Sequence, residues 1–491
     1  MSEFEWLVGA VVLLPLLASV LPVAASLKWK QVGWSLAAIT TAATLGLALA
    51  VARIVHEHGT IAYVIAGIGE RSFGIEFYVD EFSMLVVLLT LLISLGVLVY
   101  TRIGGPRGNF FYAGFLLLVG GMLGVVFTGD VFNLYVFLEI MAISSYALVS
   151  SSKYRWSTYA AFKYLLVGTV GASFYLLGVA LIFAATGTLN MQDLAIQIEA
   201  AGYTDPVVIT AFALMAVGLA VKIALFPVHT WLADAHASAP DGISAVISSL
   251  MPAVAVYAFA RILFTAFTPG FLDANPIIAE ILLVGALASL FAASLFALLQ
   301  EHIKLVLAYS TVSQFGLIFI GIAVANETAV FGSMLQIFGH GVVKASLFIL
   351  AGMFALRFGG IRTVDEYAGL AKRAPVMAGM FAVLGISMIG LPPTVGFVGK
   401  WYIALGAFEA GHALVAGLVL ASTLLSAGYI LPFINRIYFH PFAGEDVDPA
   451  AITKGMLIAV GIGAALGLTL GFFSAEIQGL IESAVTDLLQ G

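Results

Sequence analysis

Four lysines and one glutamate lie inside long apolar segments, where charged side chains are rare: Lys163, Lys222, Lys344, Lys400 and Glu139. A charge near the centre of a bilayer costs roughly 2.5–3.5 kcal/mol on insertion scales unless it is paired, hydrated or neutralised. Burial destabilises the charged forms of amines and carboxylates, so such groups can exchange protons near neutrality. The chemistry that these residues predict is proton or cation transfer within a membrane.

Two of these lysines lie beside breaks in their segments. Pro227 follows Lys222 by five residues, and Lys400 comes shortly after Pro392 and Pro393. Interrupted helices expose unpaired backbone groups, which membranes tolerate where the groups line a cavity or are buried in protein. We therefore expect a water-filled pocket beside each lysine; the alternative is two structural lysines held by fixed carboxylates.

The other candidates occupy single positions within their segments. His340 and Lys344 are four residues apart and therefore share one helical face, which favours a proton relay over a satisfied core histidine. Glu139 lies near mid-membrane and is expected to exchange a proton or a partner charge; a permanent ion pair is the alternative. Lys163 lies only a turn or two inside its segment, where a lysine can also extend to the interface.

One group of side chains has the chemistry of metal ligands: His229, Asp234 and His236. It follows the first break and precedes a Pro-Asp-Gly turn, so we interpret it as a cytoplasmic connector that positions helices. The chain has no cysteine, which excludes disulfides, thiolate metal sites and iron–sulfur clusters within it. We expect no metal and no cofactor, and any redox chemistry would belong to a partner.

The composition places all of these residues in lipid. Of 491 residues, 62% are hydrophobic, and 20 basic and 27 acidic side chains give a net charge of -7. A soluble chain would be about one quarter charged. The composition predicts one integral membrane domain over residues 1–491 in a lipid bilayer, and the absence of a basic cluster excludes nucleic-acid binding.

The apolar segments number fourteen when each span takes roughly 20 residues. We therefore predict an all-α polytopic membrane protein whose twelfth segment is interrupted, with approximate spans at 6–27, 32–54, 79–101, 110–128, 131–151, 159–185, 206–226, 243–266, 276–299, 303–323, 328–356, 376–408, 413–438 and 453–474.

The basic residues predict the orientation. Odd-numbered loops hold 13 of the 20, Lys304 among them, and even-numbered loops hold three, Arg53, Arg71 and Arg261. Because basic loops stay in the cytoplasm, we expect a multi-pass protein of the cell (inner) membrane with both termini outside. The four lysines within segments are left unexplained by topology.

The segments also indicate a duplication. Segments four to eight and nine to thirteen each contain five spans, so the second set would be inverted relative to the first. Lys163 then matches Lys344, and broken segment seven with Lys222 matches broken segment twelve with Lys400, a pattern typical of transporter sites. The predicted parts are the N-terminal helices, the first repeat, the second repeat and a last helix with its tail, at 1–105, 106–268, 270–440 and 441–491.

Several motifs together resemble a known family. They are F-L-E-I around Glu139, F-P-V-H-T-W-L-A-D-A-H-A-S-A-P after Lys222, E-H-I-K-L-V-L-A-Y-S-T-V-S-Q-F-G at 301–316, G-H-G-V-V-K-A at 339–345 and G-L-P-P-T-V-G-F-V-G-K at 390–400. Over residues 80–440 the chain is similar to the antiporter-like subunits shared by Mrp-type sodium/proton antiporters, respiratory complex I and membrane-bound hydrogenases.

This resemblance implies fourteen helices with two inverted five-helix repeats and broken helices seven and twelve. It implies a pair formed by Glu139 and Lys222, and a row of charged midplane residues that ends at Lys400. Lys163, His340 and Lys344 complete the expected set of translocation residues.

The size of the chain and Lys400 make it similar to the D-type component of the Mrp antiporter. The implied function is that of one component of a multi-subunit monovalent cation (Na⁺)/proton antiporter, with other hydrophobic subunits as partners. A proton-pumping subunit of a redox complex is the alternative, and a non-conducting membrane scaffold is a third hypothesis.

One departure concerns segment eight. Family members often have a lysine there, whereas the matching stretch from Met251 to Tyr257 lacks one, and we expect segment eight to lack a titratable group. A relay drawn by analogy would have a gap at this step, which waters held by Ser248 and Ser249 would have to bridge.

Overall fold

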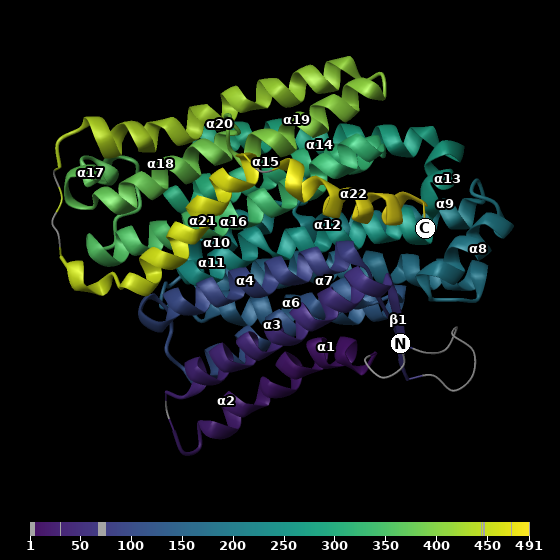
Figure 1. Ribbon diagram of the computed structural model, residues 1–491, viewed down its shortest axis with the longest axis horizontal. Coiled ribbons are helices and arrows are strands. Elements are labelled where there is room, and N and C mark those ends of the chain that lie inside the picture. Colours follow the sequence, from purple (N-terminus) through teal and green to yellow (C-terminus); the bar gives the residue numbers. More distant parts are fainter. Residues whose placement is uncertain are drawn as a thin grey trace.

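The computed structural model is a bundle of long helices that run side by side, most of them along its longest axis (Figure 1). It describes residues 5–29, 31–66, 75–442, 444, 447–472 and 474–490. Within these residues, 13 helical segments are long and apolar enough to cross a membrane. The interrupted twelfth segment is formed by two helices of 15 residues each, α18 (Pro375–Ile389) and α19 (Val395–Glu409). The prediction of an all-α polytopic membrane protein is confirmed.

The elements follow the predicted order. The first part of the chain contains α1 (Trp6–Ala18), α2 (Val20–Ala25), α3 (Gly33–His58), β1 (Ile61–Ala66), β2 (Ile75–Val79), α4 (Glu81–Gly104), α5 (Asn109–Phe127), α6 (Val131–Ser150), α7 (Ser157–Thr186), α8 (Met191–Ala201), α9 (Pro206–Ile223), α10 (Thr230–Ser238), α11 (Asp241–Ser249), α12 (Met251–Arg261) and the π-helical turn η2 (Ile262–Ala266). The second part contains α13 (Thr268–Ala274), α14 (Pro276–Leu298), α15 (Ile303–Val324), α16 (Glu327–Arg357), η3 (Asp365–Tyr367), α17 (Leu370–Arg373), α18, α19, α20 (Ala413–Phe439), η4 (Pro449–Ala451), α21 (Lys454–Phe472) and α22 (Ser474–Gln490).

Aspartates begin several of these helices. Asp80, Asp130 and Asp205 each precede a helix and accept hydrogen bonds from its first backbone N–H groups, which have no partner inside the helix. Burial raises the pKa of Asp130 to about 6, although hydrogen bonds from the backbone N–H groups of Asn133 and Phe132 partly offset this effect. Asp130 lies in the turn between α5 and α6 and caps the first turn of α6, so its ionisation affects the stability of that turn.

Three parts of the structure differ from the sequence-based expectation. The segment interpreted as a connector forms α10, a largely buried helix of nine residues that completes broken segment seven. The short helices α8 and α13 and the terminal helix α22 fall where no helix was expected. Between the second and third spans, β1 and β2 pair antiparallel, and Phe77 and Val79 in β2 are buried. Nine-residue helices escape a search that requires the length of a membrane span.

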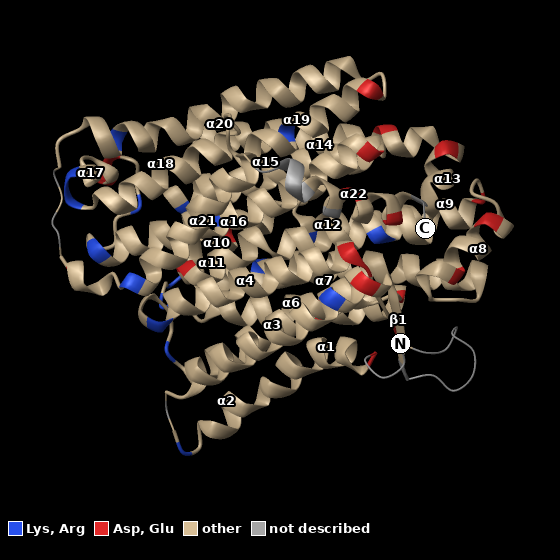
Figure 2. Cartoon of the chain, viewed as in Figure 1, with Lys and Arg blue, Asp and Glu red and all other residues tan. Residues whose placement is uncertain are grey.

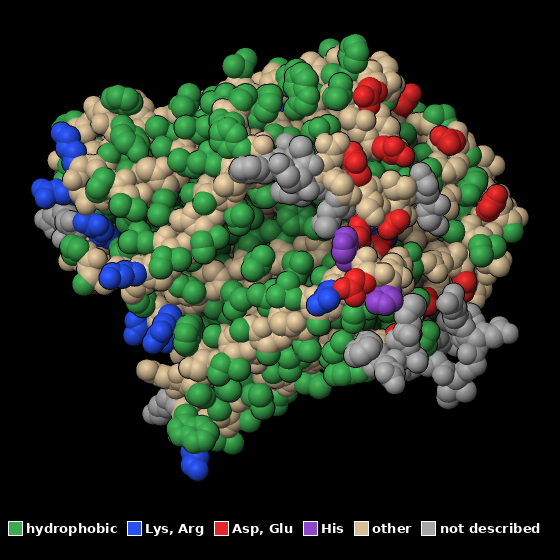
Figure 3. All heavy atoms as spheres, viewed as in Figure 1, with side chains coloured by type: hydrophobic (Ala, Val, Ile, Leu, Met, Phe, Trp, Pro, Cys, Tyr) green, Lys and Arg blue, Asp and Glu red, His purple; other side chains and the backbone are tan. Residues whose placement is uncertain are grey.

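Charged side chains gather at the two ends of the bundle, while its middle surface is apolar (Figures 2 and 3). At one end, here called the basic end, lie the last turns of α4 and α16 with Arg102 and Arg357, together with α17. At the opposite end, the acidic end, lie the first turns of the same helices with Glu81 and Glu327. In the fold, basic residues of odd-numbered loops therefore lie at one end of the bundle, away from the acidic end. Lys30 and Arg71 lie outside the described residues.

Candidate functional site

Glu139 and Lys222 form an ion pair in the interior of the bundle. Lys222 Nζ of α9 donates to Glu139 Oε1 of α6 at 2.8 Å. The lysine side chain is 4% exposed and the glutamate side chain is 21% exposed, so the pair reaches the edge of the chain only through its carboxylate. Tyr135, Tyr175 and Gly218, among others, surround the pair and leave a crevice too narrow for a water molecule, so the water-filled pocket expected beside Lys222 is not present in this conformation.

Local features of α9 place Lys222 against α6. Gly218, one turn before Lys222, lies so close to α7 that an added Cβ would be 2.6 Å from the carbonyl oxygen of Gly171. The helix then ends because Ala224 adopts a left-handed conformation with φ 64°. The indole Nε1–H of Trp231 in α10 donates to the carbonyl of Val221 at 3.0 Å, which satisfies one of the acceptors left free by the break.

Lys163 does not join that pair. Its Nζ donates to Asp234 Oδ2 of α10 at 2.6 Å, and both side chains are partly exposed, at 34% and 45%. Asp234 is thereby committed to a lysine, and the described residues contain no group of three His, Asp or Glu side chains that could hold a metal ion.

His340 and Lys344 share one face of α16, as their spacing predicts. Lys344 is fully buried, and its Nζ donates to Ser310 Oγ at 2.5 Å and to the carbonyl of Leu307 at 3.2 Å, with Met388 Sδ at 3.3 Å. His340 packs edge-on against Phe315, with ring centroids 4.9 Å apart. Among the described residues, no carboxylate lies within ion-pair distance of Lys344, so only neutral dipoles surround its amine.

Lys400 occupies the break in segment twelve. Its Nζ donates to the carbonyl of Ile389, the last residue of α18, and to Thr423 Oγ1 of α20, both at 3.1 Å. The carbonyl end of a helix carries partial negative charge, which stabilises a cation there. Lys400 lies in the helix that follows the break in segment twelve, whereas Lys222 lies in the helix that precedes the break in segment seven. The two lysines therefore differ in their order along the chain relative to the break.

Comparison with known proteins agrees with this geometry. The family model of the NADH:quinone oxidoreductase/Mrp antiporter transmembrane region matches residues 128–426. The chain belongs to this family.

Individual relatives come from two kinds of assembly. The chain is 37% identical to the N-type component of the NADH-quinone oxidoreductase of Desulforudis audaxviator, with 88% of this chain and 91% of the relative covered. It is 30% identical to the D-type component of the Na⁺/H⁺ antiporter of Bacillus subtilis, with 85% and 84% covered. A chain of the archaeal membrane-bound sulfane sulfur reductase complex superposes with a TM-score of 0.91 at 30% identity, with 98% of this chain and 97% of that chain covered.

These matches identify an antiporter-like membrane subunit, a component of ion-transporting assemblies that contain several subunits. The family resemblance read from the motifs is confirmed, and so is a multi-pass membrane location.

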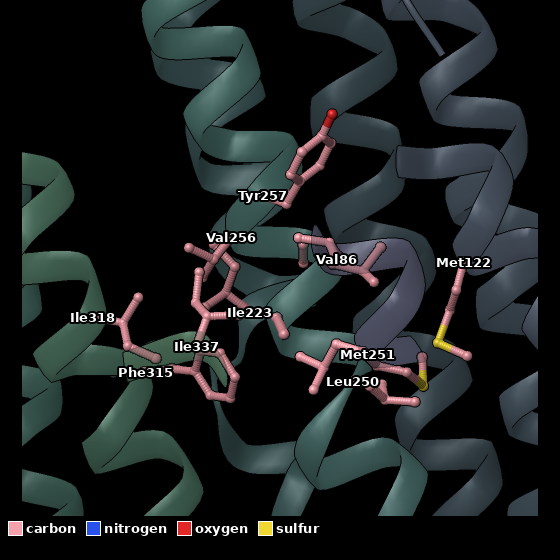
Figure 4. Close-up of a cluster of buried hydrophobic side chains, with 14 of the residues drawn as sticks. Val86, Met122, Ile223, Leu250, Met251, Val256, Tyr257, Phe315, Ile318 and Ile337 are labelled. Atoms are coloured by element: carbon pink, nitrogen blue, oxygen red, sulfur yellow. The ribbon is translucent and has the colours of Figure 1, made fainter. Parts of the chain in front are cut away.

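Helix eight of this antiporter-like subunit is formed by α11, α12 and η2. An apolar cluster surrounds its middle, where Leu250, Met251 and Val256 pack against Ile223 of α9 and Phe315 of α15, among others (Figure 4). From Leu250 to Val256 the gap expected in a relay through this helix is filled by apolar side chains, whereas Ser248, just before this stretch, shares a hydrogen bond with the Thr311 hydroxyl of α15.

The expectation that segment eight lacks a titratable group is wrong at its acidic end. Arg261 is 4% exposed and pairs with Asp80, and its Nε donates to the hydroxyl of Tyr257 at 2.9 Å. Burial opposes ionisation of Asp80, but the charge of Arg261 and hydrogen bonds from Arg261 and Ser83 hold the pKa of Asp80 below its ordinary value. This pair is fixed, because arginine keeps its proton at any physiological pH.

A second cluster that the sequence did not reveal lies near the basic end. Lys304, counted above as a loop lysine, is 3% exposed at the start of α15. Its Nζ donates to the carbonyl of Ala239 at 2.6 Å and lies 3.3 Å from Asp241 Oδ1. The other carboxylate oxygen of Asp241 accepts from Arg362 at 2.9 Å and from the Tyr100 hydroxyl at 3.2 Å. The only signal in the sequence was the position of Lys304 at the edge of a span.

Proposed function

We propose that the chain is one component of a multi-subunit monovalent cation/proton antiporter in which Glu139 and Lys222 form a switchable ion pair. The observation that carries this proposal is the 2.8 Å contact between them, with the lysine 4% exposed beside a broken helix. A purely structural subunit gains little from such a pair, because the desolvation of two charges offsets most of their attraction.

The pair can couple a proton to a cation. Protonation of Glu139 removes its charge and leaves the Lys222 ammonium uncompensated in a buried site. The ammonium is then favoured either to release one of its own protons or to move away from Glu139. A monovalent cation can then take the place of the ammonium at the carboxylate when Glu139 is ionised again. Lysine suits this exchange, since arginine would not release its proton.

The remaining midplane residues would carry the proton further. Lys344 on α16 and Lys400 at the second break donate to hydroxyls, to carbonyls and, for Lys344, to a thioether. The hydroxyls can pass a proton, and none of these partners supplies a fixed counter-charge, so these lysines with His340 can take part in the relay. Lys163, paired with Asp234, would link broken helix seven to α7 at the side of the chain. We retain the two inverted repeats, of helices four to eight and nine to thirteen, as a proposal.

We also propose that the basic end faces the cytoplasm in a cell (inner) membrane, with both termini outside. The support is the positive-inside rule applied to the segregated charges.

The proposal is tested with Glu139→Ala and Lys222→Ala in the assembled complex. Each variant should abolish cation-dependent proton movement in membrane vesicles, measured with a pH-sensitive dye, while subunit content stays normal. Arg53→Ala and Glu57→Ala are matched controls, because this pair on α3 has the same 2.8 Å separation but is 80% and 47% exposed. Wild-type transport in either midplane variant would overturn the proposal.

A proton-pumping subunit of a redox complex is a second candidate, favoured by the 37% identity to a component of an NADH-quinone oxidoreductase. Co-purification separates the two: flavin or iron–sulfur partners indicate the redox complex, and small hydrophobic subunits alone indicate the antiporter. A scaffold that conducts nothing would retain every activity of the assembly after neutral substitution of the midplane charges.

A further inference from the structure

His236 is a buried histidine whose ring nitrogens have no partner among the described residues. It lies on α10 at 0% exposure, and its ring stacks on Phe348 of α16 with centroids 5.0 Å apart. Its backbone carbonyl accepts from the hydroxyl of Ser244 at 3.1 Å. Within the part of the chain that the structure describes, nothing hydrogen-bonds to Nδ1 or Nε2. An unsatisfied buried polar group costs free energy, and such groups are retained where they serve a function.

Two lysines from different helices lie on the elements that surround this ring. Lys304 Nζ on α15 donates to the carbonyl of Ala239, three residues after His236. Phe348, on which the His236 ring stacks, lies one turn after Lys344 on α16, and His340 lies one turn before that lysine. His236 therefore lies between the element that holds the lysine near the basic end and the helix that holds the buried lysine of the second half.

The surroundings of Lys304 allow it to release a proton. Asp241 is shared by Lys304 and Arg362, so the carboxylate keeps a cationic partner when the lysine becomes neutral. The Arg362 side chain is 26% exposed, which places this cluster next to the solvent at the basic end. Glu139 pairs with Lys222 alone, so it would be left without a cationic partner if that lysine became neutral.

A route from Lys222 straight to Lys344 is obstructed. The apolar cluster around Met251 includes Ile223, directly after Lys222, and Phe315, which packs on His340 (Figure 4). Proton transfer needs groups that both donate and accept. Among the labelled side chains of this cluster only Tyr257 carries such a group, and its hydroxyl donates to the carbonyl of Val126 at 2.8 Å.

We propose that the second half of the chain draws its protons from the basic end through His236, which passes them from the Asp241–Lys304 cluster to Lys344. This inference rests on the proposed function and adds an entry route to it. An intervening water or a movement of the Lys304 side chain brings its ammonium proton to one imidazole nitrogen, and the other nitrogen releases a proton towards the Lys344 amine. Lys304 regains its proton from water at the basic end. The net result is one proton taken up at the basic end and held by Lys344, and the imidazole, left as its other tautomer, resets by a ring flip.

The test compares three variants in the complete complex reconstituted in liposomes. His236→Phe keeps a ring that can stack on Phe348 and removes both nitrogens. Lys304→Arg keeps the positive charge beside Asp241 but cannot release its proton. Phe348→Leu is the matched control, because it removes the stacking and leaves the imidazole in place.

We expect His236→Phe and Lys304→Arg to slow cation-dependent proton movement at least tenfold at unchanged subunit content and thermal stability, and Phe348→Leu to stay within twofold of the wild type. Equal loss in His236→Phe and Phe348→Leu would show a packing contribution and overturn the inference. Normal rates in His236→Phe beside an inactive Glu139→Ala would overturn it while the proposed function stands. Normal rates in Glu139→Ala as well would overturn both.

Discussion

The ion pair between Glu139 and Lys222 predicts how single and double substitutions change stability. Removing one partner of a buried pair costs about 3–5 kcal/mol, because the other charge is left uncompensated. Glu139→Gln strands a lysine that is 4% exposed, whereas Lys222→Met strands a glutamate that is 21% exposed. We therefore expect Glu139→Gln to lie towards the upper end of that range and Lys222→Met at about 3 kcal/mol.

The double variant removes both charges, so its cost should fall well below the sum of the single costs, with a coupling of at least about 2 kcal/mol. The free energy of unfolding of the purified assembly in mixed detergent micelles measures this cycle. A parallel cycle on the exposed Arg53–Glu57 pair should give no measurable coupling, because water screens the two charges. Additivity within roughly 0.5 kcal/mol for Glu139 and Lys222 would refute the reasoning. A double variant that regained both stability and transport would show that the pair is only structural.

Three further outcomes are expected. Asp130→Asn keeps an acceptor at the start of α6 and removes a carboxyl whose pKa is raised from 3.8 to about 6. Because the folded carboxyl binds its proton more tightly, the wild type loses stability as pH rises between these values. The variant should therefore match the wild type below pH 3.8 and exceed it by about 3 kcal/mol above pH 6, measured by unfolding across pH. Gly218→Ala should lower the free energy of unfolding by about 1–3 kcal/mol and slow transport, because its Cβ meets the backbone of α7. Gly46→Ala on α3 is the control: its Cβ meets no atom within 4 Å, so stability and transport should both stay unchanged. Arg261→Met should destabilise the fold by about 3–5 kcal/mol, and adding Asp80→Asn should recover most of this loss in thermal unfolding.

The sequence predicted the helices far better than the contacts of their charged residues. Runs of apolar residues predicted the spans, because a bilayer requires a minimum helix length. The partner of Glu139 came from the family resemblance, and hydropathy could not have provided it. The positive-inside rule counts any basic residue near a span end, so it places Lys304 in a loop. The burial of Lys304 depends on Asp241, which is distant in the sequence, and only the fold brings the two together.

The cations inside the bundle differ in how their charge is compensated, and this difference predicts how each one works. Arg261 has its own carboxylate and cannot release a proton, so it holds the acidic end of helix eight together. Lys222 also has its own carboxylate, but either group can change its protonation state, which suits a switch. Lys304 shares a carboxylate with an arginine and can become neutral without stranding a charge. Lys344 and Lys400 have only neutral partners among the described residues, so a proton that arrives there is held by dipoles alone and is free to move on.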